Sequence, residues 1–456
     1  MDFKIITYQL NMQYSNIAIF FLCLGCIIGW GAFVLPHTIF LPNAGLLNSI
    51  IGLCLGAILI GIIAKDYMFL LVRFPQVGGE FLFTLRILGR LHAFVCGWFL
   101  SLAYLCIIPL NATALPLLAH AFGLQSHIAL YNIDSQYVYL EDIVISLIAI
   151  LSASIINLFG IRYAFVLQKI LIMLLVGSIC FFFVTMSFSA HSLQNLMGYI
   201  DSQNLSITNI LIVVTLAPWL YVGFDCGVQI IQDVRNNPRR ITFFTIGSIV
   251  VGFCLYVFVL LFTAYGVSIE TLRASNSTFF ASLESIKGYF GIFGSMFLAL
   301  GILGAIISGI NGFFITTNKI LYAMSLHKIL PATMTKQNRF GIPYKIIYFI
   351  TIASCVLPFF GRQGLLYVVD MSSTGIVIAF LYVSVTALIT KWKETKQISS
   401  LSVINILISG VFFTLLFLPF SPAGLKTPSI IALCIWIVCG ILFYQLSTIN
   451  KNDKIL

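Results

Sequence analysis

Residues 25–36 read GCIIGWGAFVLP, and they interrupt the first long apolar stretch of the chain. Gly25, Gly29 and Gly31 weaken a helix at this point, and Pro36 follows them. Inside a lipid bilayer no water replaces a lost backbone hydrogen bond, so a break is costly unless it lines a cavity. The stretch therefore predicts a broken membrane helix whose exposed peptide groups can contact a solute.

The composition identifies the class of protein. Of the 456 residues, 60% are hydrophobic and only 8% are charged, whereas soluble domains carry about 25% charged residues. We therefore expect an all-α polytopic membrane protein. Cys23 and Cys26 form a CxxC pair without a partner pair, so we interpret them as small apolar packing residues and predict no metal site.

A membrane-spanning helix needs about 20 apolar residues, and about twelve stretches of the chain qualify. They lie near 17–41, 46–72, 92–121, 143–160, 165–188, 208–231, 242–266, 290–316, 344–361, 364–390, 400–419 and 427–446. The connections between them are short, so we predict one membrane domain over 1–456.

The positions of the basic residues predict the orientation. With a cytoplasmic N-terminus, four of the 24 Lys and Arg residues fall on the outer side, namely Arg273, Lys287, Arg362 and Lys426. The others lie inside or in the inner halves of helices, as the positive-inside rule requires. We expect cytoplasmic tails at 1–16 and 447–456, a location in the cell (inner) membrane, and no nucleic-acid partner despite the formal net charge of +10.

A second broken helix is expected in the sixth span. Residues 215–229 read TLAPWLYVGFDCGVQ and contain Pro218, Gly223 and Gly227. Two glycine-broken helices of opposite direction, five spans apart, are typical of an inverted repeat, here 17–188 and 208–390, with two additional helices in 400–446. In such transporters the ends of the half-helices meet at the middle of the membrane and bind the charged groups of the substrate.

Five motifs in order resemble the amino acid–polyamine–organocation superfamily of permeases. GCIIGWGAFVLP is similar to the pattern GxxxGxGxFxxP of its first span. The others are FPQVGGEFLF at 74–83, PWLYVGFD at 218–225 followed by QDVRNNPRR, NKILYAMSLHKILP at 318–331, and NRFGIPYK at 338–345. The resemblance covers roughly 17–345. Within the superfamily, the chain is similar to the arginine/agmatine antiporter and cationic amino-acid permease branches.

This resemblance implies a five-plus-five, LeuT-like inverted repeat with two extra C-terminal helices, and transport by alternating access. It implies that the substrate's carboxylate meets peptide groups around Trp30 and its amine meets carbonyls near Val222, with Trp219 as an aromatic gate. The expected substrate-binding residues are Ile28, Gly29, Trp30, Gly31, Ala32, Phe33, Tyr104, Trp219, Val222 and Gly223. The family usually has a small residue where Trp30 stands, so its ring either narrows the site or faces a neighbouring helix.

Two acids are candidates for proton coupling or gating. Asp225 lies in the middle of the sixth span, where an ionisable group is a functional hypothesis by default; the alternative is a structural cap of the broken helix. Asp370 lies at the start of the inner part of the tenth span. It either acts as a gate by pairing with a base such as Arg362, or stays hydrated at the mouth of the transporter.

The function that fits best is a secondary amino-acid permease, proton-coupled or exchanging, with a small-molecule substrate. No GxxxxGK[ST] loop is present, which argues against an ATP-driven pump. Sodium coupling is less favoured, although Ser308 could supply a ligand. The alternatives are a polyamine or other organic-cation antiporter and, more distantly, a membrane-embedded enzyme, a channel or a sensor. We predict no catalytic residues and no cofactor, and the sequence does not define the oligomeric state.

Overall fold

The computed structural model describes residues 17–133, 136–201, 204–233, 238–274, 281–419 and 421–452. The tail predicted at 1–16, and residues 453–456 of the tail predicted at 447–456, lie outside this part of the chain.

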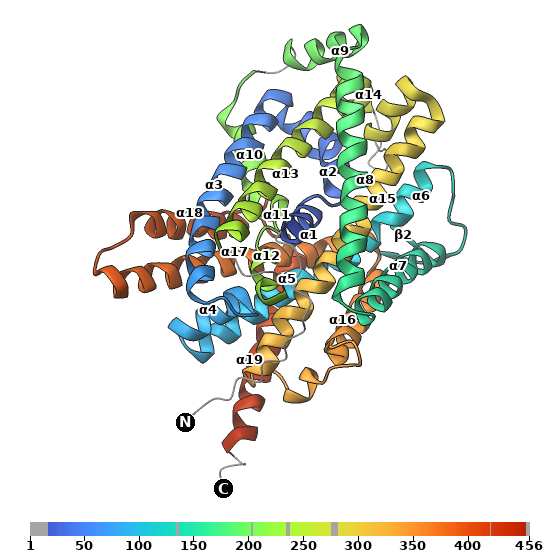
Figure 1. Ribbon diagram of the computed structural model, residues 1–456. Helices are drawn as coiled ribbons and strands as arrows, with labels where there is room; N and C mark the ends of the chain where they lie inside the picture. Colours follow the sequence, from blue (N-terminus) through green and yellow to red (C-terminus); the bar gives the residue numbers. More distant parts are fainter. Residues whose placement is uncertain are drawn as a thin grey trace.

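Helices build most of the described chain (Figure 1). The first half contains α1 (Ile17–Ile27), α2 (Gly31–Leu35), a π-helix (Pro36–Ala44), α3 (Leu46–Arg73), α4 (Gly79–Ile87), α5 (Arg90–Ala112), α6 (Ala114–Ala121), α7 (Leu140–Leu158), α8 (Ile161–Ser187) and α9 (Ala190–Asp201). The second half contains α10 (Ile207–Thr215), α11 (Ala217–Leu220), α12 (Cys226–Gln229), α13 (Pro238–Gly266), α14 (Ile269–Ala274), α15 (Ala281–Leu326), α16 (Tyr344–Val356), α17 (Gly361–Thr395), α18 (Ser400–Phe417) and α19 (Thr427–Asn452). Short 3₁₀ turns lie at Ile231–Asp233, Ala332–Thr335 and Leu357–Phe360.

The membrane-spanning character of the chain is confirmed. In the described residues, nine helices are long and apolar enough to cross a membrane, and the bent pair of α1 with its continuation makes a tenth. The shorter α16 lies at the ninth predicted span, and α10, α11 and α12 lie at the sixth. The protein is thus an all-α polytopic membrane protein, whereas the count of twelve, the repeat and the domain limits remain predictions.

Two features differ in detail from the expected spans. A short antiparallel hairpin, β1 (Ala129–Ile133) and β2 (Gln136–Tyr139), lies in the predicted connection 122–142. The eighth span, expected at 290–316, belongs to α15, which continues to Leu326 and is broken at Gly291 (φ 62°, ψ −159°). A positive φ of this kind is accessible to glycine, which explains why the helix can change direction there.

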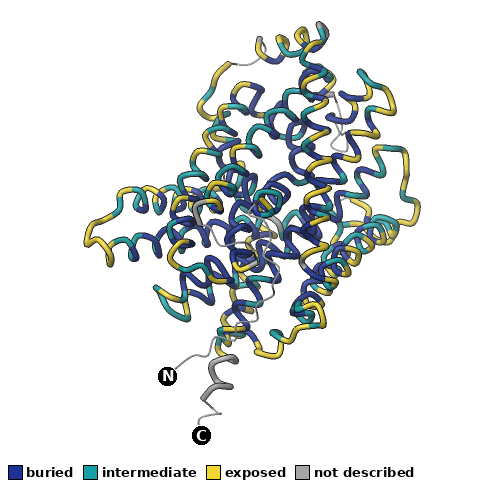
Figure 2. Tube along the Cα trace, viewed as in Figure 1, coloured by how far each residue is buried: buried dark blue, intermediate teal, exposed yellow. Residues whose placement is uncertain are grey.

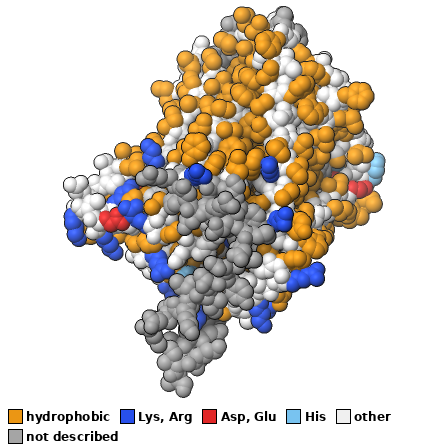
Figure 3. All heavy atoms as spheres, viewed as in Figure 1, with side chains coloured by type: hydrophobic (Ala, Val, Ile, Leu, Met, Phe, Trp, Pro, Cys, Tyr) orange, Lys and Arg blue, Asp and Glu red, His pale blue; other side chains and the backbone are white. Residues whose placement is uncertain are grey.

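The outer surface is suited to lipid. Large apolar side chains such as Phe188 (86% exposed), Phe293 (82%) and Ile207 (79%) point away from the protein, and apolar exposure on this scale marks a membrane or protein interface. Figure 3 shows hydrophobic side chains over the upper part of the molecule, whereas Lys and Arg lie lower, toward the end where Figure 1 places α19.

The core is centred on α5 and on the broken helices. In an apolar 18-residue segment of Arg90–Ala121, 83% of the residues are buried, against 17% in the corresponding segment of Thr427–Gln445. α5 packs against α15 and α17, and α1 packs against α13, α15 and α12. Figure 2 shows that the buried residues gather in the centre of the bundle, where the interrupted segments lie.

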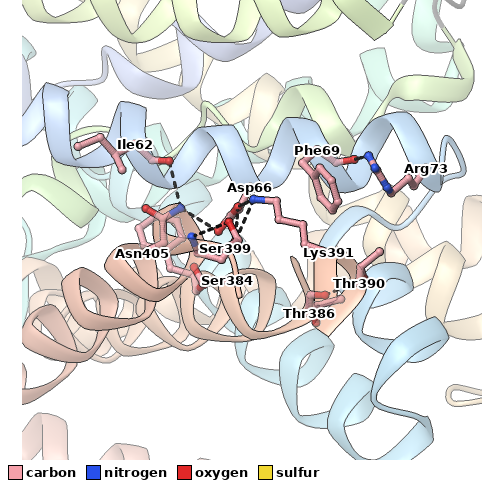
Figure 4. A network of polar contacts seen from close by, with 12 residues as sticks. Ile62, Asp66, Phe69, Arg73, Ser384, Thr386, Thr390, Lys391, Ser399 and Asn405 are labelled. Carbon is pink, nitrogen blue, oxygen red and sulfur yellow. Dashed lines mark hydrogen bonds and ion pairs between the residues drawn. The ribbon is translucent and has the colours of Figure 1, made fainter. Parts of the chain in front are cut away.

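A buried polar network joins α3, α17 and α18 (Figure 4). The carboxylate of Asp66, which is fully buried, accepts hydrogen bonds from Lys391 Nζ (2.7 Å), Ser402 Oγ (2.9 Å) and Asn405 Nδ2 (2.8 Å). Two turns along α3, Arg73 pairs with Glu394, but these side chains are 31% and 42% exposed. The two ion pairs join the same two helices and differ mainly in burial.

We expect Lys391→Ala to destabilise the protein much more than Arg73→Ala. Removing Lys391 leaves the Asp66 carboxylate buried without its cation, which typically costs about 3–5 kcal/mol. Solvent screens the exposed Arg73–Glu394 pair, so its loss should change stability little. The measurement is the midpoint of thermal unfolding of each detergent-purified variant, and equal decreases for the two variants would contradict this interpretation.

Candidate functional site

The first membrane helix is interrupted at 28–30. α1 ends at Ile27, α2 begins at Gly31, and the two parts of the span are bent by 44°. The glycines allow close approach: a Cβ on Gly31 would lie 2.8 Å from Trp219 Cη2, and one on Gly29 would lie 3.1 Å from Asn111 Oδ1. The Ala32 amide donates to the Gly29 carbonyl at 3.2 Å and thereby starts the second half-helix.

The sixth span is interrupted at 221–225. α11 ends at Leu220, α12 begins at Cys226, and between them Gly223 has a φ of 115°. A Cβ on Gly223 would lie 2.3 Å from Cys26 Cβ and 2.8 Å from the Cys26 carbonyl carbon. Gly223 therefore lies directly against the end of α1, and the two interruptions pack on each other.

Tyr256 on α13 joins the two interrupted helices, and sequence analysis did not identify it. Its phenol O–H lies 3.1 Å from the carbonyl oxygen of Ile27 and 3.2 Å from that of Leu220. These carbonyls belong to the last residues of α1 and α11, where the helix itself leaves acceptors unsatisfied. One buried side chain thus serves as hydrogen-bond donor to the ends of both helices.

The structure brings Asp225 and Tyr104 together. The Tyr104 hydroxyl donates to Asp225 Oδ2 at 2.6 Å, and the Gly223 amide donates to Asp225 Oδ1 at 2.9 Å. Both side chains are fully buried, and among the described residues no cationic group lies within ion-pair distance of this carboxyl group. The arrangement links α5 to the interruption of the sixth span.

A second buried carboxyl group, Glu80, lies near this site. Glu80 is fully buried at the start of α4, and Gln229 of α12 donates a hydrogen bond to it. Burial raises the pKa of the Glu80 carboxyl well above its usual range, and the charge of Asp225 raises it further. The sequence signal was the acid in FPQVGGEFLF, but nothing in that motif indicates that α4 packs against α12.

A cavity of about 500 Å³ lies beside the two interruptions. Of the predicted site residues, Trp30, Trp219 and Asp370 line it. The two indoles meet edge to face, with ring centroids 6.4 Å apart. The remaining predicted residues, all within the described chain, do not line the cavity: Ile28, Gly29, Gly31, Ala32, Phe33, Tyr104, Val222, Gly223 and Asp225.

Asp370 and Arg362 have different partners. Asp370 Oδ2 accepts a hydrogen bond from Ser429 at 3.2 Å. The guanidinium of Arg362 lies 4.2 Å from the centre of the Trp30 ring, where its charge meets the electron-rich face of the indole. The two residues form no ion pair in this structure, and the gating role of Asp370 remains a prediction.

The side-chain amide of Gln168, on α8, packs against α1. Gln168 Nε2 lies 3.5 Å from the Phe21 carbonyl, and Gln168 Oε1 accepts from Asn311 Nδ2 at 2.9 Å. The Ser308 hydroxyl donates to the Ala305 carbonyl at 3.0 Å and lies 3.4 Å from that of Gly25. In the described chain no group of three or more His, Cys, Asp and Glu side chains is placed to hold a metal ion.

We expect Gly223→Ala to lower the yield of folded protein and its midpoint of thermal unfolding, whereas Gly247→Ala should change neither. The new Cβ at position 223 would overlap Cys26 at a strained positive φ. At Gly247 nothing lies within 4 Å of the added atom. Normal folding of the Gly223 variant would show that the two helix interruptions do not pack as described.

Comparison with curated proteins identifies transporters. The chain is 23% identical to the methylthioribose transporter of Bacillus subtilis (strain 168), covering 94% of this chain and 92% of that protein. It is 23% identical to the vacuolar cationic amino acid transporter 4 of Arabidopsis thaliana, covering 84% of this chain and 64% of that protein. It is also 23% identical to the serine/threonine exchanger SteT of Bacillus subtilis (strain 168), covering 68% of this chain and 67% of that protein.

A family model described as amino acid permease matches residues 14–443. The relatives are transporters and not enzymes, as the sequence predicted. Because the match spans nearly the whole chain, with its membrane helices and both interruptions, the protein belongs to the amino acid permease family.

Proposed function

We propose that this permease is a secondary active transporter that moves an amino acid across the membrane by alternating access. Family membership supports the substrate class, and the paired interruptions at 28–30 and 221–225 support the mechanism. Broken helices of this kind present unpaired peptide groups to a solute at the middle of the membrane. The inverted repeat of 17–188 and 208–390, followed by the helices of 400–446, is part of this proposal.

We propose that transport is coupled to protons. The observation that supports this proposal is the buried, hydrogen-bonded carboxyl group of Asp225. It is fully buried at the interruption and accepts hydrogen bonds from Tyr104 and Gly223. A charge in such a place is costly, and intramembrane acids of this type mark ion and proton pathways. Binding and release of a proton there would change the contact between α5 and the sixth span during transport.

Sodium is less favoured because the side-chain amide of Gln168 packs against α1. Gln168 directs an amide nitrogen toward the Phe21 carbonyl and occupies the space beside Gly25. Sodium requires a shell of oxygen ligands, and an amide N–H in that place repels a cation instead of coordinating it. Ser308 alone does not replace the missing ligands.

The proposed substrate class is an amino acid. The relatives are named for methylthioribose, for cationic amino acids, and for serine and threonine, so they do not agree on one substrate. A polyamine or organic-cation antiporter of the same fold is the alternative. Exchange without net uptake is compatible with the same geometry.

We propose that both termini are cytoplasmic and that the protein lies in the cell (inner) membrane. In Figure 3 the Lys and Arg side chains gather toward the lower end of the molecule, where Figure 1 places α19, the last helix before the C-terminal tail. Basic connections remain on the cytoplasmic side of a membrane. The cavity beside Trp30 would then open to the outside.

Asp225→Asn should flatten the pH dependence of transport. In proteoliposomes loaded at neutral pH, we expect wild-type uptake of a labelled amino acid to rise as the external pH falls from 8 to 5, because a proton must bind Asp225 before transport. Asparagine keeps the hydrogen-bonding shape but cannot take up a proton. The measurement is the initial uptake rate across this pH range.

Glu394→Gln is the matched control, because it removes an acid that pairs at the surface with Arg73. Its pH profile should follow wild type. A wild-type profile in the Asp225 variant would remove Asp225 from proton coupling. Uptake that needs sodium instead of a proton gradient would overturn the coupling part of the proposal.

A further inference from the structure

The cavity beside the two interruptions contains a guanidinium that the central site does not use. Arg362, at the start of α17, lies over Trp30, and Trp30 in turn meets Trp219. The cavity of about 500 Å³ lies within the range of 300–1,000 Å³ typical of small-molecule sites. Arg362 therefore lines a cavity large enough for an amino acid, and its guanidinium lies over the Trp30 indole.

Most N–H donors of the Arg362 guanidinium have no hydrogen-bond acceptor among the described residues. In the described chain its guanidinium makes one hydrogen bond, to Thr113 Oγ1, and at 3.4 Å this bond is long. Arginine presents five N–H donors in a planar fork. No carboxylate of the described residues lies within ion-pair distance of Arg362. The indole face beneath it attracts the cation but accepts few of these donors.

The other charged groups of the cavity do not neutralise Arg362. Asp370 lies eight residues further along α17, about 12 Å at 1.5 Å per residue. Its carboxyl group accepts from Ser429 and interacts with Lys426. The ionisable residues that line the cavity are Arg362, Lys426, Asp370 and His37. The two cations, Arg362 and Lys426, outnumber the one acid, Asp370. An excess of positive charge in a cleft raises the local concentration of anionic groups.

We propose that this cavity is a first binding site for the substrate, in which Arg362 binds the substrate's carboxylate through its guanidinium fork before the solute reaches the helix interruptions. The inference rests on the proposed function and narrows it. Carboxylate-bearing amino acids are accepted, whereas polyamines and other amines without a carboxylate are repelled by Arg362 and Lys426. A guanidinium suits this task because it binds a carboxylate with two parallel hydrogen bonds.

The first test varies the ligand and leaves the protein unchanged. Wild-type proteoliposomes are given a mixture of labelled L-amino acids, and the one accumulated fastest becomes the probe. Its unlabelled form, its α-amide and its decarboxylated amine then compete for uptake. We expect the amino acid to compete at least about tenfold better than either analogue. Equal competition by the amide and the amine would overturn the inference.

The second test varies Arg362. Arg362→Gln should raise the KM for the probe by about tenfold while the maximal rate changes little, because initial capture is weakened and the later steps are retained. Arg362→Lys should retain part of the affinity, since it keeps the charge but loses the planar fork. If Arg362→Gln does not fold, the lysine variant still decides the question, because an unchanged KM in that variant would contradict the role of the guanidinium fork.

Arg339→Gln is the control, because Arg339 also lies over an aromatic ring, Phe340, at 4.8 Å, but is exposed and does not line the cavity. Its KM should equal that of wild type. A wild-type KM in Arg362→Gln would refute the carboxylate site while leaving the permease function intact. If wild type transports no amino acid at all, the proposed function itself fails.

Discussion

The two helix interruptions are stable because they pack on each other and share one hydrogen-bond donor, the Tyr256 hydroxyl of α13. Lipid supplies no water to the peptide groups that a broken helix releases. Here the last carbonyls of α1 and α11 share the hydroxyl of Tyr256, and Gly223 packs directly on Cys26. Neither interruption would retain these contacts without the other. The paired breaks are therefore one structural unit, around which the rest of the bundle is packed.

This unit separates two different environments. On one side lie the fully buried groups Asp225, Tyr104 and Glu80, which are hydrogen-bonded to one another or to neighbouring helices. On the other side lies the cavity, in which Arg362 faces the Trp30 indole. Trp30 and Trp219, which belong to the two interrupted spans, line this cavity and meet edge to face.

Part of this arrangement could be predicted from the sequence, because it depends on local chemistry. Glycine and proline spacing indicated both interruptions, and the acid beside the second one indicated Asp225. Tyr256, Glu80 and Gln168 were not found, since each acts through contacts with helices far away in the chain, and a lone Tyr or Gln in an apolar helix carries no pattern. For Asp370 the sequence left two alternatives, pairing with a base such as Arg362 or hydration at the mouth, and it gave no sign of the contacts that the structure shows, Arg362 with Trp30 and Asp370 with Ser429.

In the proposed mechanism the proton would act on a contact between helices. The unit formed by α1, α11 and α13 is joined through Tyr256, whereas the hydrogen bond from Tyr104 to Asp225 connects this unit to α5. Hydrogen bonds to an ionised group are roughly twice as strong as those between neutral groups. A proton on Asp225 would therefore weaken the link to α5 and leave the Tyr256 contacts unchanged. The paired interruptions could then shift as one body, and the two indoles that move with them would open or close the passage from the cavity.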